Sequence, residues 1–152
     1  MNIKRYGFIL VALLVLGWSL GAVHAAPTDN AIESRTEYLD PNADFSRLTE
    51  SEALQLAYWV LYPGNHNYNG HRIAAMKEIR EAAKLLAIEL NGDGKGHEDQ
   101  SVSDARFLAV QRLLGQLRSR LTGEDQKPMA AHVDEALKHL SKGLDIRAVE
   151  NE

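Results

Sequence analysis

Apolar residues recur every three or four positions along four stretches of the chain, the spacing of one face of an α-helix. The pattern predicts helices over residues 50–62, 70–90, 103–121 and 127–146. In the third stretch the spacing approaches that of a coiled-coil seam, at Phe107, Val110, Leu114, Leu117 and Leu121. No stretch of the sequence shows a pattern that predicts a β-strand. The fold is therefore predicted to be all-α.

Residues that favour helix ends bound these stretches. Thr49 and Glu52 match a capping box, in which a hydroxyl and a carboxylate each accept a hydrogen bond from an unpaired backbone amide. Asn91-Gly92 is expected to end the second helix, because glycine tolerates the left-handed backbone found there. A Ser-x-x-Asp segment that ends at Asp104 is expected to begin the third helix.

Short loops between helices of similar length favour antiparallel neighbours. We therefore predict an antiparallel up-down-up-down four-helix bundle over residues 49–147. In that topology the first and third loops lie at the same end. The glycine-rich loop over residues 91–99 then lies at the opposite end. It lacks the bidentate glutamate of a calcium loop, which favours a solvated, flexible linker.

The first residues resemble a secretory signal. Lys4 and Arg5 precede an apolar run over residues 6–23, and small residues flank a cleavage position after Ala25. The alternative is an uncleaved membrane anchor, since the run is nearly long enough to cross a bilayer. Residues 1–25 are thus predicted to be a cleaved signal peptide, and residues 26–48 a polar, loosely ordered leader. The expected location is the periplasm or the cell exterior.

Charge and composition narrow the classes of function. The predicted signal contains two of the 17 basic residues and none of the 21 acidic ones, so the mature chain has 15 basic residues and a charge of −6. A mildly acidic chain is a poor candidate for binding nucleic acid, because the phosphates of nucleic acid bind clusters of positive charge. The absence of cysteine excludes disulfides and most thiol chemistry. No second apolar run is long enough to span a membrane.

Candidate chemistry gathers in the segment over residues 65–72, which we call the histidine turn. It holds His66, Tyr68, Gly70, His71 and Arg72, the residues predicted to bind a ligand. In the alternating topology the start of the fourth helix lies at the same end. His132 would then join His66 and His71.

Several interpretations of this end remain open. His66, His71 and His132 would suit a transition metal such as Zn²⁺, Cu²⁺ or Ni²⁺. Backbone amides near Gly70 and the guanidinium of Arg72 would instead suit an anion or another small polar ligand. A structural interpretation has Arg72 and the histidines bonding loop carbonyls and carboxylates. Finally, His71 has the chemistry of a general base, but the sequence fixes no catalytic partner beside it.

The histidine turn also resembles a known signature. Its spacing is similar to the His-x-Tyr-x-Gly-His-Arg motif of an uncharacterised family of small exported bacterial helical proteins. The likeness extends through residues 91–94, the Ser103-Asp104 pair and residues 132–136, and so covers most of the mature chain. The resemblance implies a helical fold and export, and it implies no activity.

These observations favour a non-enzymatic binding or accessory module of the cell envelope. The expected partner is an envelope protein or a small polar ligand, and the chain is expected to be a monomer or a dimer. The alternative is a metal-binding protein or metal-dependent enzyme that uses the histidines at one end of the bundle.

Overall fold

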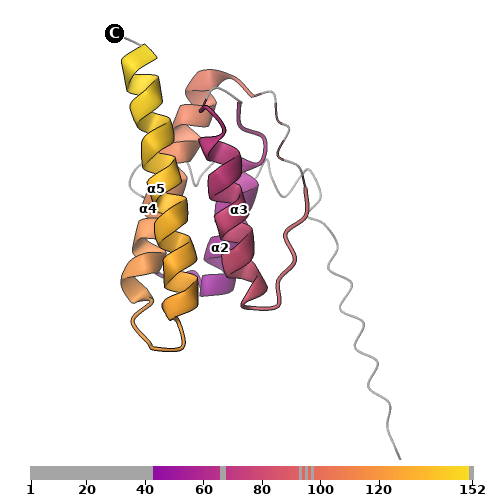
Figure 1. Cartoon of the computed structure of the whole chain (residues 1–152), viewed down its shortest axis with the longest axis vertical. Coiled ribbons are helices and arrows are strands. Elements are labelled where there is room, and N and C mark those ends of the chain that lie inside the picture. The colour runs from indigo at the N-terminus through magenta and orange to yellow at the C-terminus, as the bar shows by residue number, and fades with distance from the viewer. Residues whose placement is uncertain (1–42, 66–67, 93, 95, 97, 151–152) are drawn as a thin grey trace, which may run out of the picture.

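The computed structural model describes residues 43–65, 68–92, 94, 96 and 98–150. It contains the helices α2 (Glu50–Leu61), α3 (His71–Lys84), α4 (Gln100–Arg120) and α5 (Lys127–Glu150) (Figure 1). The described residues include no strand, and the prediction of an all-α fold with four helices is confirmed. The predicted signal peptide lies outside the described residues, as does most of the predicted leader.

Helix α2 begins where the sequence predicts. The amide of Glu52 donates to the hydroxyl of Thr49 at 3.2 Å, and the amide of Thr49 donates to the Glu52 carboxylate at 2.9 Å. The capping box is therefore confirmed, and it satisfies two amides that the first turn would otherwise leave unpaired. These bonds also lower the pKa of Glu52, with the Thr49 amide as the main cause.

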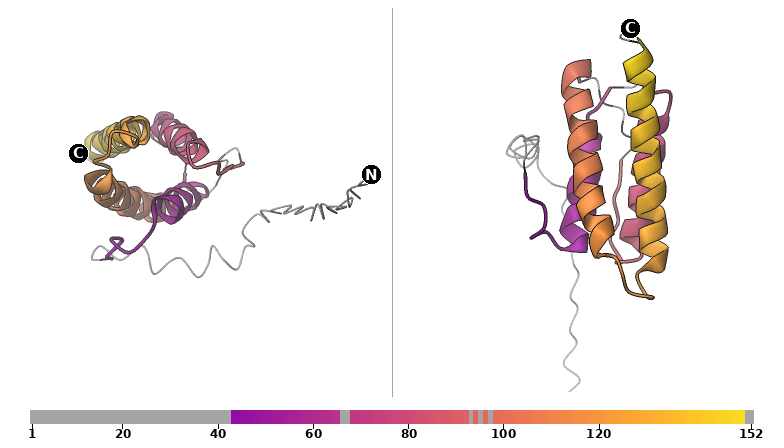
Figure 2. Two further views of the ribbon diagram at one scale, coloured as in Figure 1. Left: turned by 90° about the horizontal axis from the view of Figure 1, so that it is seen from below. Right: turned by 90° about the vertical axis from the view of Figure 1, so that its left-hand side faces the viewer.

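The four helices surround one apolar core. Viewed along the bundle, α2, α3, α5 and α4 follow one another around a ring (Figure 2). The most extensive packing joins α3 to α5. The core is filled by residues from all four helices, and its fully buried members include Leu54, Ile79, Leu114 and Leu140.

The predicted up-down-up-down order is wrong. His71 contacts His139 and Glu78 contacts His132, so α3 and α5 are antiparallel. At one end of α4, Ser103 contacts Asn65, which follows α2. At its other end Gln116 contacts Phe45, which precedes α2, so these two helices are also antiparallel. Since α2 and α3 are antiparallel too, the four directions are up, down, down, up, and the first and third loops lie at opposite ends (Figure 1).

The altered topology follows from the connection between α3 and α4. We call residues 85–99 the return segment, and its described residues run back along the bundle before α4 begins (Figure 1). The 14 residues of α3 span about 21 Å at 1.5 Å per residue, a length that the extended segment readily covers. The apolar spacing of residues 85–90 had suggested further helix, but Ile88 and Leu90 instead pack into the core from the return segment.

A Schellman motif ends α3 without glycine. The amide of Ile88 donates to the carbonyl of Ala83 at 3.1 Å, and that of Ala87 to the carbonyl of Lys84 at 3.0 Å. Ala87 has a φ of 55°, in the left-handed region where this motif usually has glycine. The prediction that Asn91-Gly92 ends the helix is therefore wrong, because α3 ends at Lys84.

We expect Ala87→Gly to stabilise the protein by about 0.5–1 kcal/mol, since a side chain in the left-handed region costs more than the added freedom of glycine. Urea denaturation followed by circular dichroism measures the change. Ala131→Gly, at an exposed position inside α5, is the matched control and should destabilise by about 1 kcal/mol. A loss of stability in both variants would contradict the expectation.

Two other boundaries differ from prediction. Helix α4 begins at Gln100 instead of 103, and Asp99 is its N-cap. Asp104 lies inside the helix and accepts from Tyr68 of the histidine turn. Helix α5 continues to Glu150, past the predicted end at 146.

The end of the predicted leader packs on the bundle. Phe45 is buried, and its amide donates to Oε1 of Gln116 at 3.0 Å. The guanidinium of Arg120 donates to the carbonyls of Ser46 and Leu48 at 2.8 and 2.7 Å. Residues 43–48 are therefore held against α4.

Candidate functional site

The histidine turn lies where α2, α3, α4 and the end of the return segment meet. Its described motif residues are Tyr68, Gly70, His71 and Arg72, while His66 lies outside the described residues. Gly70 precedes α3 with a φ of 81°, and Asn69 before it has a φ of 47°. Two successive left-handed residues turn the chain into α3 and orient its first turn.

Arg72 is buried among backbone carbonyls, with only 1 % of its surface exposed. Its guanidinium donates to the carbonyls of Leu61 at 2.9 Å and Tyr62 at 3.1 Å, at the C-terminal end of α2. It also donates to the carbonyl of Asn65 at 3.0 Å and to that of Gly94 in the return segment. One side chain thus ties together three segments that are separate in the sequence.

These bonds favour the structural interpretation of Arg72. Burial lowers the pKa of Arg72, and the nearby Tyr68 and Glu98 oppose that shift. The group stays charged because arginine is protonated throughout the physiological range. Its positive charge at the C-terminal end of α2 also complements the helix dipole. With its planar fork directed at carbonyls, Arg72 is poorly arranged to bind an external anion.

Tyr68 is fully buried and also serves the fold. Its hydroxyl donates to Oδ1 of Asp104 at 2.6 Å and accepts from Nε2 of Gln100 at 2.9 Å. Its ring stacks on Phe107 with the centroids 3.8 Å apart. Burial, followed by the hydrogen bond to Asp104, raises the pKa of Tyr68 far above its usual value. The phenol therefore remains a proton donor in this network.

Helix α5 completes the surroundings of Tyr68. Arg147 forms an ion pair with Asp104, with Nε and Oδ1 3.7 Å apart. Gly143 is buried where α5 crosses the stacked rings, and a Cβ atom there would lie 2.8 Å from Cε1 of Phe107. Helix α5 therefore approaches the rings closely because residue 143 has no side chain.

His71 is partly exposed and faces α5. Its Nδ1 lies 3.0 Å from Nδ1 of His139, and the two ring centroids are 5.3 Å apart. The contact needs one protonated and one unprotonated Nδ1, so the two imidazoles share a proton. Burial lowers the pKa of His71, and the nearby His139 and Lys142 lower it further. We call this contact the imidazole pair.

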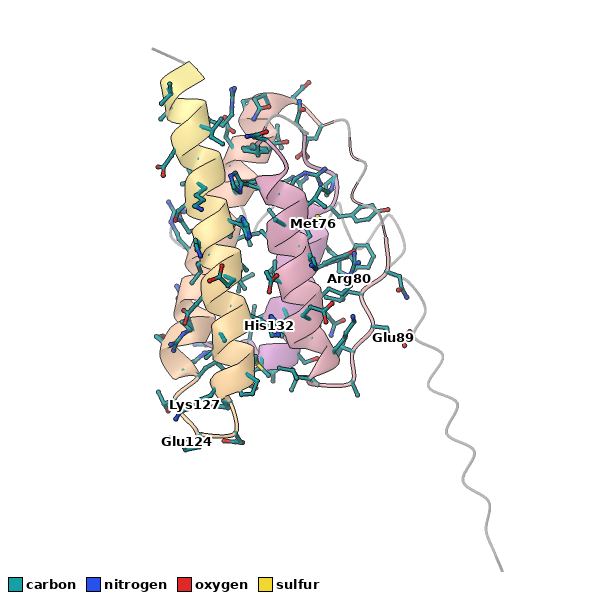
Figure 3. All side chains as sticks on the ribbon, viewed as in Figure 1. Met76, Arg80, Glu89, Glu124, Lys127 and His132 are labelled. Carbon is teal, nitrogen blue, oxygen red and sulfur yellow. The ribbon has the colours of Figure 1, made fainter. Side chains whose placement is uncertain are left out.

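The structure does not bring His132 to the histidine turn. Its Nδ1 lies 2.8 Å from Oε2 of Glu78, further along the interface of α3 and α5 (Figure 3). The expectation that His132 joins His71 depended on the alternating topology. Because the first and third loops lie at opposite ends, His139 takes the place beside His71 that the sequence analysis assigned to His132.

The return segment reaches the histidine turn, contrary to the prediction for the glycine-rich loop. Gly94 is buried and accepts from Arg72, while Glu98 pairs with Arg106 of α4 at 2.8 Å. Met76 and Arg80 project from α3 toward this segment (Figure 3). Gly94, Gly96 and Glu98 therefore lie against the bundle, and the prediction of a solvated linker is wrong for them. Asn91, Gly92 and Asp99 are exposed.

Several residues of this end were not recognised as part of it. Ser103 accepts from the amide of Asn65 at 2.8 Å, Asp104 binds Tyr68, and His139 binds His71. The Ser103-Asp104 pair had carried a signal, since it belongs to the stretch that resembles the family. His139 lies outside the motif and outside the stretches that resemble the family.

No family model matches the chain, and neither a curated protein nor a solved structure matches it. The resemblance to the family of small exported helical proteins therefore stays a prediction, supported by the motif and by the stretches that extend it.

Proposed function

We propose that this chain is an exported, non-enzymatic helical module of the cell envelope that binds a protein or a small polar ligand at its histidine end. The imidazole pair is the observation that carries the proposal. Arg72 and Tyr68 direct their polar atoms at the fold itself, whereas His71 and His139 keep part of their surface at the solvent. The two imidazoles are therefore the described side chains of the histidine end that can offer ring nitrogens to a ligand.

The amino-terminal sequence supports export. A basic start, an apolar run and a small-x-small site before Ala26 form the layout of a cleaved signal. Among the described residues, no helix combines the length and apolar character needed to cross a bilayer. We propose that the mature chain begins at Ala26 and acts in the periplasm or outside the cell.

A metal-binding protein or metal-dependent enzyme is the second candidate. The short distance between the nitrogens of His71 and His139 favours it. His139 then replaces His132 as the partner of His71.

The proposed function is tested by affinity capture from an envelope extract with a chain tagged at its C-terminus. The intact mass of the exported chain should correspond to cleavage after Ala25. A double variant, His71→Gln with His139→Gln, should lose the captured partner because its amides cannot reproduce two imidazoles.

The matched control lies at the opposite end of the bundle. Glu124 and Lys127 form an exposed ion pair at 2.6 Å there (Figure 3). Their double replacement by alanine should leave capture unchanged, because exposed pairs contribute little to the fold. Capture that is equal in both double variants would count against the histidine end, and an uncleaved mass would count against export.

A further inference from the structure

We infer that His71 and His139 form a binding site for a divalent transition metal, with Cu²⁺ preferred over Ni²⁺ and Zn²⁺. The inference rests on the proposed function, since it identifies a ligand for the same histidine end. It assigns the site to a pair of residues from α3 and α5 that the sequence motif alone does not bring together.

The separation of the two nitrogens fits this chemistry. Imidazole nitrogen lies about 2.0–2.1 Å from the metal, so two neighbouring ligands of a square-planar ion lie about 2.9 Å apart. The observed distance between the Nδ1 atoms is 3.0 Å. A tetrahedral ion would need about 3.4 Å with the same bonds. A small rotation of the two rings from the observed contact reaches either spacing, so the pair can hold a divalent ion and the preference for Cu²⁺ rests on the affinity order for nitrogen ligands.

In the metal-free pair the two nitrogens compete for one proton. A metal ion on the solvent side would accept a lone pair from each Nδ1, and the proton that lies between the rings would pass through water to Nε2 of its own ring, so that both imidazoles bind the ion in the neutral form. Each imidazole then turns about its Cβ–Cγ bond so that both lone pairs meet at the ion. Both side chains are partly exposed, so the ion has a path to the site and water can fill its other positions.

The backbone on both sides of the pair is held firmly. Arg72 follows His71 directly and ties the first turn of α3 to the end of α2, to Asn65 and to the return segment. Helix α5 is held four residues beyond His139, where Gly143 packs against Tyr68 and Phe107. Ligands on rigid helices keep their spacing before the metal arrives, which reduces the cost of binding.

Within the described part of the chain, the site has two protein ligands. The described residues contain no group of three or more His, Cys, Asp or Glu side chains that would hold an ion together. His132 is occupied by Glu78 at 2.8 Å. We therefore expect a two-histidine site completed by water, in which Cu²⁺ binds most strongly because it heads the affinity order for nitrogen ligands.

The test is a calorimetric titration of the purified protein with CuCl₂, NiCl₂ and ZnCl₂, together with electron paramagnetic resonance of the copper form. We expect one Cu²⁺ per chain, a tetragonal spectrum with nitrogen coupling, and weaker binding of the other two ions. His71→Ala and His139→Ala should each weaken Cu²⁺ binding by more than about tenfold, because removing a ligand costs more than removing its outer partner.

Two further variants, His139→Gln and His132→Ala, serve as controls. His139→Gln keeps a polar side chain that can bond to His71 but lacks the imidazole, and circular dichroism of the metal-free protein verifies that each variant is folded. His132→Ala should retain full Cu²⁺ affinity. The inference is overturned if folded His139→Gln binds Cu²⁺ as tightly as the unaltered protein, or if loss of His132 is what abolishes binding.

The metal inference and the proposed function fail separately. If no Cu²⁺ binds but capture of a partner still requires His71 and His139, the metal inference is wrong and the proposed binding module is supported. If Cu²⁺ binds as expected and no partner depends on the pair, the metal site stands without a protein partner.

Discussion

Replacing Arg72 with alanine should destabilise the protein by about 3–5 kcal/mol, which is the usual cost of removing one member of a buried charged network. The carbonyls of Leu61, Tyr62 and Gly94 would lose their donor, and a cavity would open between α2, α3 and the return segment. Arg72→Lys should lower the free energy of unfolding by less than Arg72→Ala does. It should still destabilise the protein, because an ammonium group cannot reproduce a planar fork of donors.

Urea denaturation gives the free energy of unfolding for each variant, and thermal melting should show a loss of roughly 10–20 °C for Arg72→Ala. The control is Arg112→Ala, at an exposed position of α4, which should change the free energy by less than about 0.5 kcal/mol. If Arg72→Ala proved as mild as Arg112→Ala, the buried guanidinium would not be holding the three segments together.

Gly143→Ala should destabilise the protein by up to about 2 kcal/mol, although alanine favours a helix more than glycine does. The helix preference gains about 1 kcal/mol. Against this, the new methyl group would press on Phe107 at 2.8 Å and on Cδ1 of Tyr68 at 3.4 Å. Overpacking of this kind costs about 1–3 kcal/mol, and the stacked rings have little room to move because Tyr68 is held by Asp104.

Gly115→Ala is the control, because Gly115 is exposed inside α4 and a Cβ atom there would meet nothing within 4 Å. It should stabilise the protein by up to about 1 kcal/mol. The two glycine variants are therefore expected to shift the melting temperature in opposite directions. A shift of the same sign in both would contradict the close approach of α5 to the rings.

The four helices could be predicted because the residues that define a helical face are close together in the sequence. Leu114 and Leu117 reveal their helix through their own spacing, and Thr49 with Glu52 reveals a helix start through bonds within one turn. The end of α3 could not be predicted, and the reason is also local. Its left-handed position holds Ala87, so no glycine marked it, whereas Asn91-Gly92 marked a helix end that the structure does not use.

The topology and the partners at the histidine end could not be predicted from local patterns. Whether residues 85–99 turn back at once or run along the bundle depends on distant contacts, such as Gly94 with Arg72 and Glu98 with Arg106. The motif singled out Tyr68, His71 and Arg72, but it did not indicate which of them would be buried. Their surroundings come from residues such as Asp104 and His139, which follow them by 36 and 68 positions.

The order of the helices also has a consequence for folding. Helix α3 packs mainly on α5, through contacts between residues 54 and 68 positions apart. Contacts of such long sequence separation slow folding, because the intervening chain must close before they form. We therefore expect slower folding than for a bundle in which α3 also packs on α4, the next helix in the sequence. The core cannot close until the last helix has been synthesised, an order that suits a chain proposed to cross a membrane before it folds.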